Sequence, residues 1–344
     1  MTSSTTLLLE ALARRPALVG ALSLYACFYV AAGRAITRPA PFGPRWLAAL
    51  VARLLTWVMR VVARCPLTCA LPDETIPPGK QHVVVWHPHG SYTAMCFMHC
   101  AQFTVQASPL TWYPGVAPLL FRLPLFRELL LLVNARSVAA RSLEGLCAAG
   151  LSVGVQPGGI PEQLVADHTR ELAVFSRRLG FVRPAMRHGS SESHMSVSSS
   201  YLGFVRLAMR HGMPLLPVYI FGESQAYTTL GDGGRALSAW CFKWLGAPLV
   251  PVLGRFALPW LVPVPTSVHV RWGNPVLTGP RNENPTLEQV EAVFEAYLAE
   301  LRRVFDAHKD ACLPPEVAAR GLAVRFTGKP AAGPRQPEAP QANL

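Results

Sequence analysis

The part of the sequence best suited to catalysis is the tetrapeptide His87-Pro88-His89-Gly90, which brings two imidazoles together. An imidazole changes charge near neutral pH, so a histidine beside a substrate hydroxyl can act as a general base. Pro88 restricts the backbone of His87, and Gly90 leaves room for a substrate to approach the chain. The alternatives are two histidines with a purely structural role and a metal site, but for a metal the loop supplies no carboxylate or third ligand. The tetrapeptide therefore predicts proton transfer without a metal.

A second loop, QPGGIPE at residues 156–162, combines a flexible backbone with a carboxylate. Pro157, Gly158 and Gly159 suit a turn whose N–H groups can approach a substrate and stabilise an oxyanion. Glu162 can orient a histidine or stabilise its positive charge. Because a plain turn uses the same residue types, the local sequence leaves a purely structural role open.

A competing motif surrounds Ser152, where GLSVG at residues 150–154 fits the nucleophile elbow of serine hydrolases. That elbow requires a strand, then a sharp turn with the serine, then a helix. Ser152 is instead expected at the beginning of a strand or inside it. The motif keeps a serine lipid hydrolase as an alternative of a different class.

The two loops follow short apolar runs that are typical of buried strands, at residues 82–86 and 151–155. Residues 213–221 and 268–272 have the same character. Residues 286–309 form the clearest helix, with a capping box and an apolar stripe. Strands that alternate with helices predict an α/β sandwich around a mostly parallel sheet, with catalytic loops at the strand ends.

Two apolar segments near the N-terminus predict membrane attachment. Residues 16–33 carry no charge and are just long enough to span a bilayer; a cleaved signal peptide is the alternative. Residues 46–64 are apolar except for three arginines on one helical face, which suits the membrane interface or the second leg of a hairpin. A helix packed on the body is the alternative for this segment. In tandem, the two segments predict a membrane hairpin, and the apolar, proline-rich residues 244–265 are a further candidate lipid contact.

The composition of the 344 residues narrows the classes of function: 51% are hydrophobic, 15% are charged and the net charge is +12. A mean hydropathy of +0.26 is too low for a polytopic transporter. A basic surface suits nucleic acid, an anionic membrane or a phosphate ligand, and no nucleic-acid-binding motif is present. The eight cysteines lack zinc-site spacing and are expected as buried thiols in a reducing compartment.

The sequence LGFVRPAMRHG at residues 179–189 recurs as LGFVRLAMRHG at residues 202–212. The copies differ only in Pro184 and Leu207, and a proline would interrupt a helix. We therefore expect the second copy to occupy the structural position, with the serine-rich residues between the copies in a loop. The expected organisation is a membrane-anchoring region at 1–66, a main domain at 67–327 with an inserted or duplicated segment at 180–202, and a disordered tail at 328–344.

The domain at 67–327 can be compared with a known family because several motifs occur in it in order. HPHG, PGGIPE, the segment 203–223 with its FGE ending and RWGNPV at residues 271–276 resemble the diacylglycerol acyltransferase 2 family. This family includes monoacylglycerol and wax-alcohol acyltransferases, and the resemblance runs from about residue 17 to residue 316. It implies a fold similar to that of the glycerophosphate acyltransferases. It also implies transfer of a fatty acyl group from acyl-CoA to a neutral hydroxyl, at the endoplasmic reticulum membrane or the lipid-droplet surface.

The glycerophosphate-type relatives pair their catalytic histidine with an aspartate five residues later. The corresponding positions here are Tyr92 and Ala94, so the orienting carboxylate must come from elsewhere. We expect it to be Glu162, with Glu223 as the second candidate. The inserted segment also departs from the family pattern, and a catalytically inactive lipid-binding homologue is therefore another alternative.

The resemblance also suggests roles for the remaining candidate residues. His89 is the expected base, His87 positions the loop or stabilises the oxyanion, and the choice between them stays open. Arg136 and Arg141 are candidates for binding the CoA phosphates, with solvated surface arginines as the alternative.

The loop at residues 157–159 stands where those relatives carry a phosphate-binding arginine, which fits an uncharged acceptor. Triacylglycerol formation from diacylglycerol is the expected reaction, and monoacylglycerol or a long-chain alcohol stay open as acceptors. The expected partners are acyl-CoA as co-substrate, a neutral lipid acceptor and the bilayer. No metal or further cofactor is expected, and homo-oligomerisation stays open.

Overall fold

The computed structural model describes residues 15–71, 79–105, 111–176, 202–245, 249–259 and 262–327. The predicted tail at 328–344 and residues 180–201 of the predicted insert lie outside this described part of the chain.

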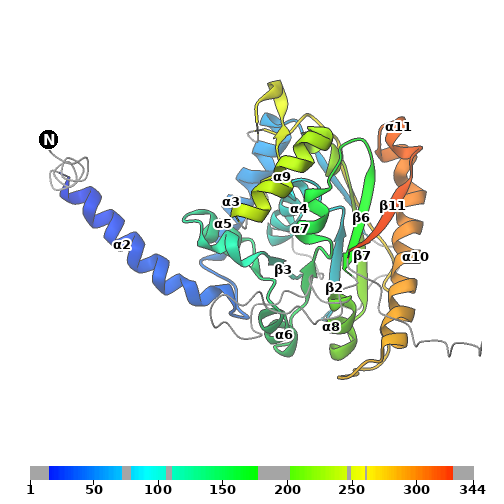
Figure 1. The fold of residues 1–344 in the computed structure, drawn as a ribbon. Coiled ribbons are helices and arrows are strands. Elements are labelled where there is room, and N and C mark those ends of the chain that lie inside the picture. The colour runs from blue at the N-terminus through cyan, green and yellow to red at the C-terminus, as the bar shows by residue number, and fades with distance from the viewer. Residues whose placement is uncertain are drawn as a thin grey trace, which may run out of the picture.

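The described body is built around a seven-stranded sheet (Figure 1). The neighbouring strands are parallel, except that β10 is antiparallel to β7. The strand order is β1 (Leu67–Ala70), β10 (Val268–Trp272), β7 (Leu215–Phe221), β2 (Val83–His87), β5 (Val153–Val155), β3 (Tyr113–Val116) and β4 (Arg136–Ser137). This arrangement confirms the predicted α/β class with a mostly parallel sheet.

Two smaller pairs of strands complete the sheet structure of the described residues. β6 (Glu171–Ser176) runs parallel to β11 (Leu322–Thr327), and β8 (Thr228–Thr229) runs antiparallel to β9 (Val252–Leu253). The sequence analysis did not predict these strands: β8 and β9 have two residues each, β11 alternates in exposure, and β6 is a buried strand that the analysis missed.

The central strand β2 is buried on both faces of the sheet, which explains its continuous apolar run. Val83 and Val85 belong to one buried cluster, whereas Val84 and Trp86 belong to another. Since side chains alternate along a strand, the imidazole of His87 projects on the same side as Val83 and Val85.

The predicted C-terminal helix is α10 (Leu287–Cys312), and its capping box of Thr286 and Gln289 is present. It packs on β7 and on α8 (Gly203–His211). The other helices are α2 (Pro16–Ala32), α3 (Arg45–Trp57), α4 (Ala94–Val105), α5 (Phe126–Leu132), α6 (Ala140–Ala148), α7 (Gly159–Leu164), α9 (Gly231–Leu245) and α11 (Pro315–Ala318). Short 3₁₀ turns are η1 (Gly33–Ile36), η3 (Pro118–Arg122), η6 (Ser224–Ala226) and η7 (Arg255–Ala257), and η2 (Val58–Val62) is π-helical.

The N-terminal helices behave differently from each other. α2 and η1 together form a candidate membrane span, Pro16–Ile36, and α2 extends away from the body in Figure 1. α3 instead packs on α4 and α5, with Ala52 and Ala101 fully buried in one cluster. Among the described helices only Pro16–Ile36 is long and apolar enough to span, so the predicted membrane hairpin is not confirmed.

The second copy of the repeated sequence forms α8, as expected, and its Leu207 is completely buried. Gly212 ends this helix in the left-handed conformation that favours glycine. The first copy lies outside the described residues.

Candidate active site

The tetrapeptide HPHG lies at the carboxyl end of β2, because His87 is the last residue of that strand. The neighbouring strands β5 and β7 run parallel to β2 and end at the same edge of the sheet. The loop QPGGIPE and Glu223 follow these two strands. The structure therefore brings together the two loops and the second candidate carboxylate.

His87 is a fully buried imidazole in apolar surroundings. Its ring centroid lies 5.0 Å from that of Phe175 and 6.3 Å from that of Tyr297. Neither ring nitrogen has a hydrogen-bond partner among the described residues. Burial, with a smaller contribution from His89, lowers the pKa of His87 to about 3, so the ring is neutral at pH 7.

His89 is partly buried and has polar partners. Its Nδ1 lies 3.0 Å from the hydroxyl of Thr93 and 3.3 Å from the carbonyl oxygen of Gly90. Burial lowers the pKa of His89 to about 4, and the bond to Gly90 opposes this shift. If Nδ1 carries the proton and donates it to these oxygens, Nε2 keeps the lone pair that a base needs.

Thr93 is a functional candidate that the sequence analysis missed. Its hydroxyl also donates to the carbonyl oxygen of His89, at 3.1 Å, and its φ of 57° is unusual for a β-branched residue. The available signal was its spacing, four residues after His89 and directly before α4.

Glu162 is completely enclosed, and it contacts backbone rather than an imidazole. The main-chain N–H of His89 donates to its Oε1, and that of Val174 donates to Oε2 at 2.9 Å. Burial raises the pKa of Glu162 to about 8 against the opposing effect of these two bonds. Its described hydrogen bonds hold the backbone of the HPHG loop against β6 and include no histidine ring, so a role for Glu162 in orienting a histidine stays a prediction.

Close packing against Glu162 explains why residue 158 is a glycine. A Cβ at Gly158 would overlap Oε2 of Glu162, so a larger residue would displace the carboxylate. Gly159 begins α7 with a positive φ of 47°. The role of Pro157, Gly158 and Gly159 in substrate binding stays a prediction.

Glu223, like Glu162, is a buried carboxylic group that binds main-chain N–H groups next to the HPHG loop. It accepts hydrogen bonds from the main-chain N–H of Cys96 at 2.8 Å and of Met95 at 3.3 Å, in the first turn of α4. A Cβ at Gly90, which has a φ of 61°, would lie 2.8 Å from its Cγ. Burial raises the pKa of Glu223 to about 8. Its described contacts join the end of β7 to the loop, and they include no imidazole.

Glu171 is a third buried carboxylic group that the sequence analysis missed, because it opens the otherwise apolar strand β6. It accepts hydrogen bonds from Tyr219 at 2.7 Å and from Gln225 at 2.8 Å. Its charge adds to the rise in the pKa of both Glu162 and Glu223. Burial therefore favours the protonated form of Glu162 and Glu223 at neutral pH, and it also raises the pKa of Glu171.

The two arginines proposed for the CoA phosphates have no described contact with the HPHG loop. Arg136 is completely buried and donates to the carbonyl oxygens of Arg38 at 2.9 Å and Ala135 at 2.7 Å, and to that of Ala40. Nε, Nη1 and Nη2 each donate to a main-chain carbonyl, and no described contact joins Arg136 to the HPHG loop, so its binding of CoA phosphates stays a prediction. Arg141 is exposed on α6, and no described contact joins it to the HPHG loop.

Ser152 lies at the opposite edge of the sheet, before β5 rather than after it. Its hydroxyl accepts a hydrogen bond from the main-chain N–H of His82 at 3.1 Å and lies 3.2 Å from His82 Nδ1. A nucleophile elbow needs the serine after its strand, so the elbow required by the alternative hydrolase hypothesis is not formed. In the described part of the chain, no three His, Cys, Asp or Glu side chains are grouped to hold a metal ion.

The fold and the site define an α/β protein with a histidine loop at the carboxyl edge of its sheet. The family model for diacylglycerol acyltransferase matches residues 22–195 and 191–318. The two matched segments overlap, and each contains one copy of the repeated sequence. The chain belongs to the diacylglycerol acyltransferase family and is an O-acyltransferase, as the resemblance predicted.

Individual relatives differ in the acceptor that their names state. The chain is 27% identical over 262 residues to 2-acylglycerol O-acyltransferase 3 of Homo sapiens, covering 70% of this chain and 68% of the relative. It is 29% identical to diacylglycerol O-acyltransferase 2 of Danio rerio, covering 70% of this chain and 64% of the relative. For acyl-CoA wax alcohol acyltransferase 2 of Homo sapiens the identity is 29%, with 70% and 69% covered.

A search of solved structures finds the 1-acyl-sn-glycerophosphate acyltransferase PlsC of Thermotoga maritima. It shares 16% identity and a TM-score of 0.39, covering 82% of this chain and 95% of the solved chain. The fold described above rests on this chain's own strands and helices, and the closer likeness to glycerophosphate acyltransferases stays a prediction.

Proposed function

We propose that this O-acyltransferase transfers a fatty acyl group from acyl-CoA to diacylglycerol, with His89 as the base. The observation that carries the proposal is the environment of His89: a neutral imidazole, held through Nδ1, in a loop at the carboxyl edge of the sheet. Only the neutral form can accept a proton, and the lowered pKa keeps that form dominant at pH 7.

In the proposed reaction Nε2 of His89 removes the proton from the acceptor hydroxyl while the oxygen attacks the thioester carbonyl. The new C–O bond forms, the C–S bond breaks, and the departing CoA sulfur takes the proton back from His89. No acyl-enzyme is formed and no further cofactor is needed. His87 supports the loop from the apolar side, in contact with Phe175 and Tyr297.

Monoacylglycerol and long-chain alcohols are the other proposed acceptors, because the similar relatives are named for all three kinds of acceptor. The discriminating experiment uses the full chain in microsomes with labelled acyl-CoA and equimolar competing acceptors. Labelled triacylglycerol as the main product supports the proposal. Labelled diacylglycerol as the main product would make monoacylglycerol the acceptor, and labelled wax ester would make a long-chain alcohol the acceptor. Absence of any transfer would favour an inactive lipid-binding homologue.

The proposed location is the endoplasmic reticulum membrane or the lipid-droplet surface, with attachment through α2 and contact through α3. The apolar span Pro16–Ile36 supports this, as does the exposure of Trp46 and Trp57 on α3. The test is the localisation of a fluorescently labelled full chain in cells with and without lipid loading.

A further inference from the structure

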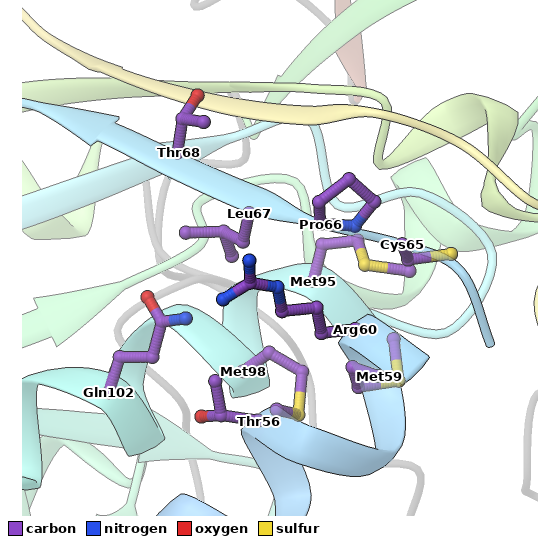
Figure 2. Close-up of a pocket in the computed structure, with 10 residues that line it drawn as sticks. All are labelled: Thr56, Met59, Arg60, Cys65, Pro66, Leu67, Thr68, Met95, Met98 and Gln102. Atoms are coloured by element: carbon purple, nitrogen blue, oxygen red, sulfur yellow. The ribbon is translucent and has the colours of Figure 1, made fainter. Parts of the chain in front are cut away.

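A cavity of about 280 Å³ lies behind the start of α4, where α4 meets η2 and β1 (Figure 2). Most of its wall is apolar, and three methionines are prominent in it: Met59, Met95 and Met98. Methionine is flexible and polarisable, so such a wall adapts to apolar ligands of varying shape. The volume is near the lower end of the range for small-molecule sites, roughly 300 to 1,000 Å³, which suits one hydrocarbon chain better than two.

The cavity extends along α4 from the end nearest the HPHG loop. Met95, Met98 and Gln102 are spaced by three and four residues, so they share one face of the helix. The Met95 end is joined to the loop by Glu223, which accepts a hydrogen bond from Met95 N–H and contacts Gly90. Over this face α4 rises by about 10 Å, at about 1.5 Å per residue.

The opposite wall is formed by the π-helical turn η2, which supplies Met59 and Arg60. Single π-helical turns inside helices occur often at functional sites. In Figure 2 the side chain of Arg60 extends towards Leu67 and Gln102. Arg60 is exposed, so its aliphatic stem covers apolar wall while its charged end reaches the surface. The cavity therefore opens at the surface beside the apolar face of α3.

We propose that this cavity holds the fatty acyl chain of the thioester substrate, with the thioester end at Met95 and the methyl end towards Gln102. The proposal rests on the proposed function, since it assigns one substrate chain to the same site. A diacylglycerol acceptor carries two chains and would need a wider space. The chain enters past Arg60 from the lipid side of the molecule.

The test is a graded set of substitutions along α4, assayed with octanoyl-, lauroyl-, palmitoyl- and oleoyl-CoA at a fixed acceptor concentration. Gln102→Trp closes the far end of the cavity, so kcat/KM for palmitoyl-CoA should fall about tenfold or more while octanoyl-CoA, which fits within about 10 Å, is retained. Met98→Trp blocks the cavity nearer the loop, so kcat/KM for octanoyl-CoA should fall as well. Each methylene excluded from the cavity costs about fourfold in binding.

Met98→Leu is the matched control, because it changes shape with little change in volume and should keep the wild-type profile. Thermal unfolding of each variant checks that the fold is intact. An unchanged order of acyl-CoA preference in both tryptophan variants would overturn the proposal. So would a change in preference among acceptors instead of donors, since the cavity would then hold the acceptor chain.

A binding measurement separates this proposal from the proposed function. The fluorescent fatty acid cis-parinaric acid is titrated into the detergent-solubilised full chain, and palmitoyl-CoA is then used to displace it. Binding that is lost in Met98→Trp and kept in Met98→Leu supports the cavity even if no transfer is detected. Equal binding by the wild type and Met98→Trp would refute the cavity assignment whatever the activity.

Discussion

The two histidines of the HPHG loop share a motif but not an environment. His87 is enclosed by Phe175 and Tyr297 and has no polar partner in the described structure. His89 is held by Thr93 and by the carbonyl oxygen of Gly90. A base must be held in one tautomer, and of the two histidines only His89 has polar partners that hold its ring in the described structure.

We expect His89→Ala to lower the rate of acyl transfer by about 10²- to 10⁴-fold, the usual contribution of a general base. Initial rates with labelled acyl-CoA measure this, with membrane-bound protein quantified in each sample. His87→Leu is the comparison, because it replaces an unpartnered imidazole by an apolar side chain in an apolar site. It should reduce the rate less than His89→Ala, and the reverse order would assign the base to His87.

The buried titratable groups around the loop predict how stability depends on pH. The pKa values of Glu162 and Glu223 rise from 4.5 to about 8, so the folded state holds more protons than the unfolded state in that interval. Stability from these groups is therefore lost as the pH rises towards 8. The pKa values of His87 and His89 fall from 6.5 to about 3 and about 4, so their contribution increases with pH only up to about 6.5.

Of these four groups, only Glu162 and Glu223 change the stability between pH 6.5 and 8. We therefore expect the melting temperature to fall across that interval. Thermal unfolding of the detergent-solubilised chain at closely spaced pH values measures it. Glu223→Gln removes one titrating group and should flatten the curve. A melting temperature that rises from pH 6.5 to 8 in the wild type would contradict the assignment of raised pKa values.

At the scale of elements, the repeated sequence offers a comparison within one chain. The second copy forms α8, with Leu207 completely buried against the core, and the first copy has proline at the equivalent position. A proline inside a helix removes a hydrogen bond and clashes with the preceding turn, at a cost of about 3 kcal/mol or more. Leu207→Pro should therefore destabilise the protein severely.

Pro184→Leu is the matched change in the first copy and should leave the melting temperature unaltered if the second copy is the structural one. Deleting residues 180–202 restores a single uninterrupted copy and should preserve folding. Thermal unfolding and membrane yield measure all three variants. Equal sensitivity of both copies would mean that each occupies a structural position.

The strands that carry the site could be predicted from sequence, because a strand buried on both faces is continuously apolar. The prediction at 82–86 became β2 (Val83–His87), and that at 268–272 became β10. Because parallel strands end at one edge, the meeting of the HPHG and QPGG loops followed from the pattern. The contacts of the carboxylates did not, since Glu162 and Glu223 bind main-chain N–H groups that only tertiary packing brings to them.

The contacts of Arg136 could not be predicted for a related reason. A sequence shows that an arginine is present, but not whether backbone carbonyls from a distant segment already satisfy its donors. Here the carbonyls come from Arg38 and Ala40, about a hundred residues earlier in the chain. The membrane hairpin is not confirmed, because α3 packs on α4 and α5 with one apolar face and exposes apolar side chains on another.

At the scale of the whole molecule, large apolar side chains remain exposed on several neighbouring segments near η2. On α3 these are Trp46, Leu50, Leu54 and Trp57, with exposed fractions of 68%, 56%, 57% and 54%. Phe256, which forms the tip of the turn η7, is 78% exposed, and the adjacent Arg255 donates to the carbonyl oxygen of Val62 at the end of η2. The described residues 45–71 contain four arginines and no acidic residue. Apolar side chains with interspersed cations suit the interface of an anionic bilayer.

This surface predicts how activity responds when the acceptor is carried in a bilayer. We expect Leu50→Ser with Leu54→Ser to raise KM for diacylglycerol in anionic vesicles about tenfold, because two exposed leucines lose their insertion into the interface. The same double variant should keep nearly normal kcat and melting temperature, since both side chains are exposed in the folded body. With acceptor and enzyme in detergent micelles the difference should disappear.

Leu277→Ser is the control, because Leu277 is 73% exposed but lies in the segment after β10, outside α3, η2 and the Phe256 tip. It should leave KM unchanged in both vesicles and micelles. Flotation of the vesicles measures how much enzyme stays attached through α2 in each variant. A change in KM at equal attachment then reports on how the active site is oriented towards the bilayer. If Leu277→Ser and the double variant raise KM equally, the apolar face of α3 does not orient the body on the bilayer, and α2 alone accounts for membrane contact.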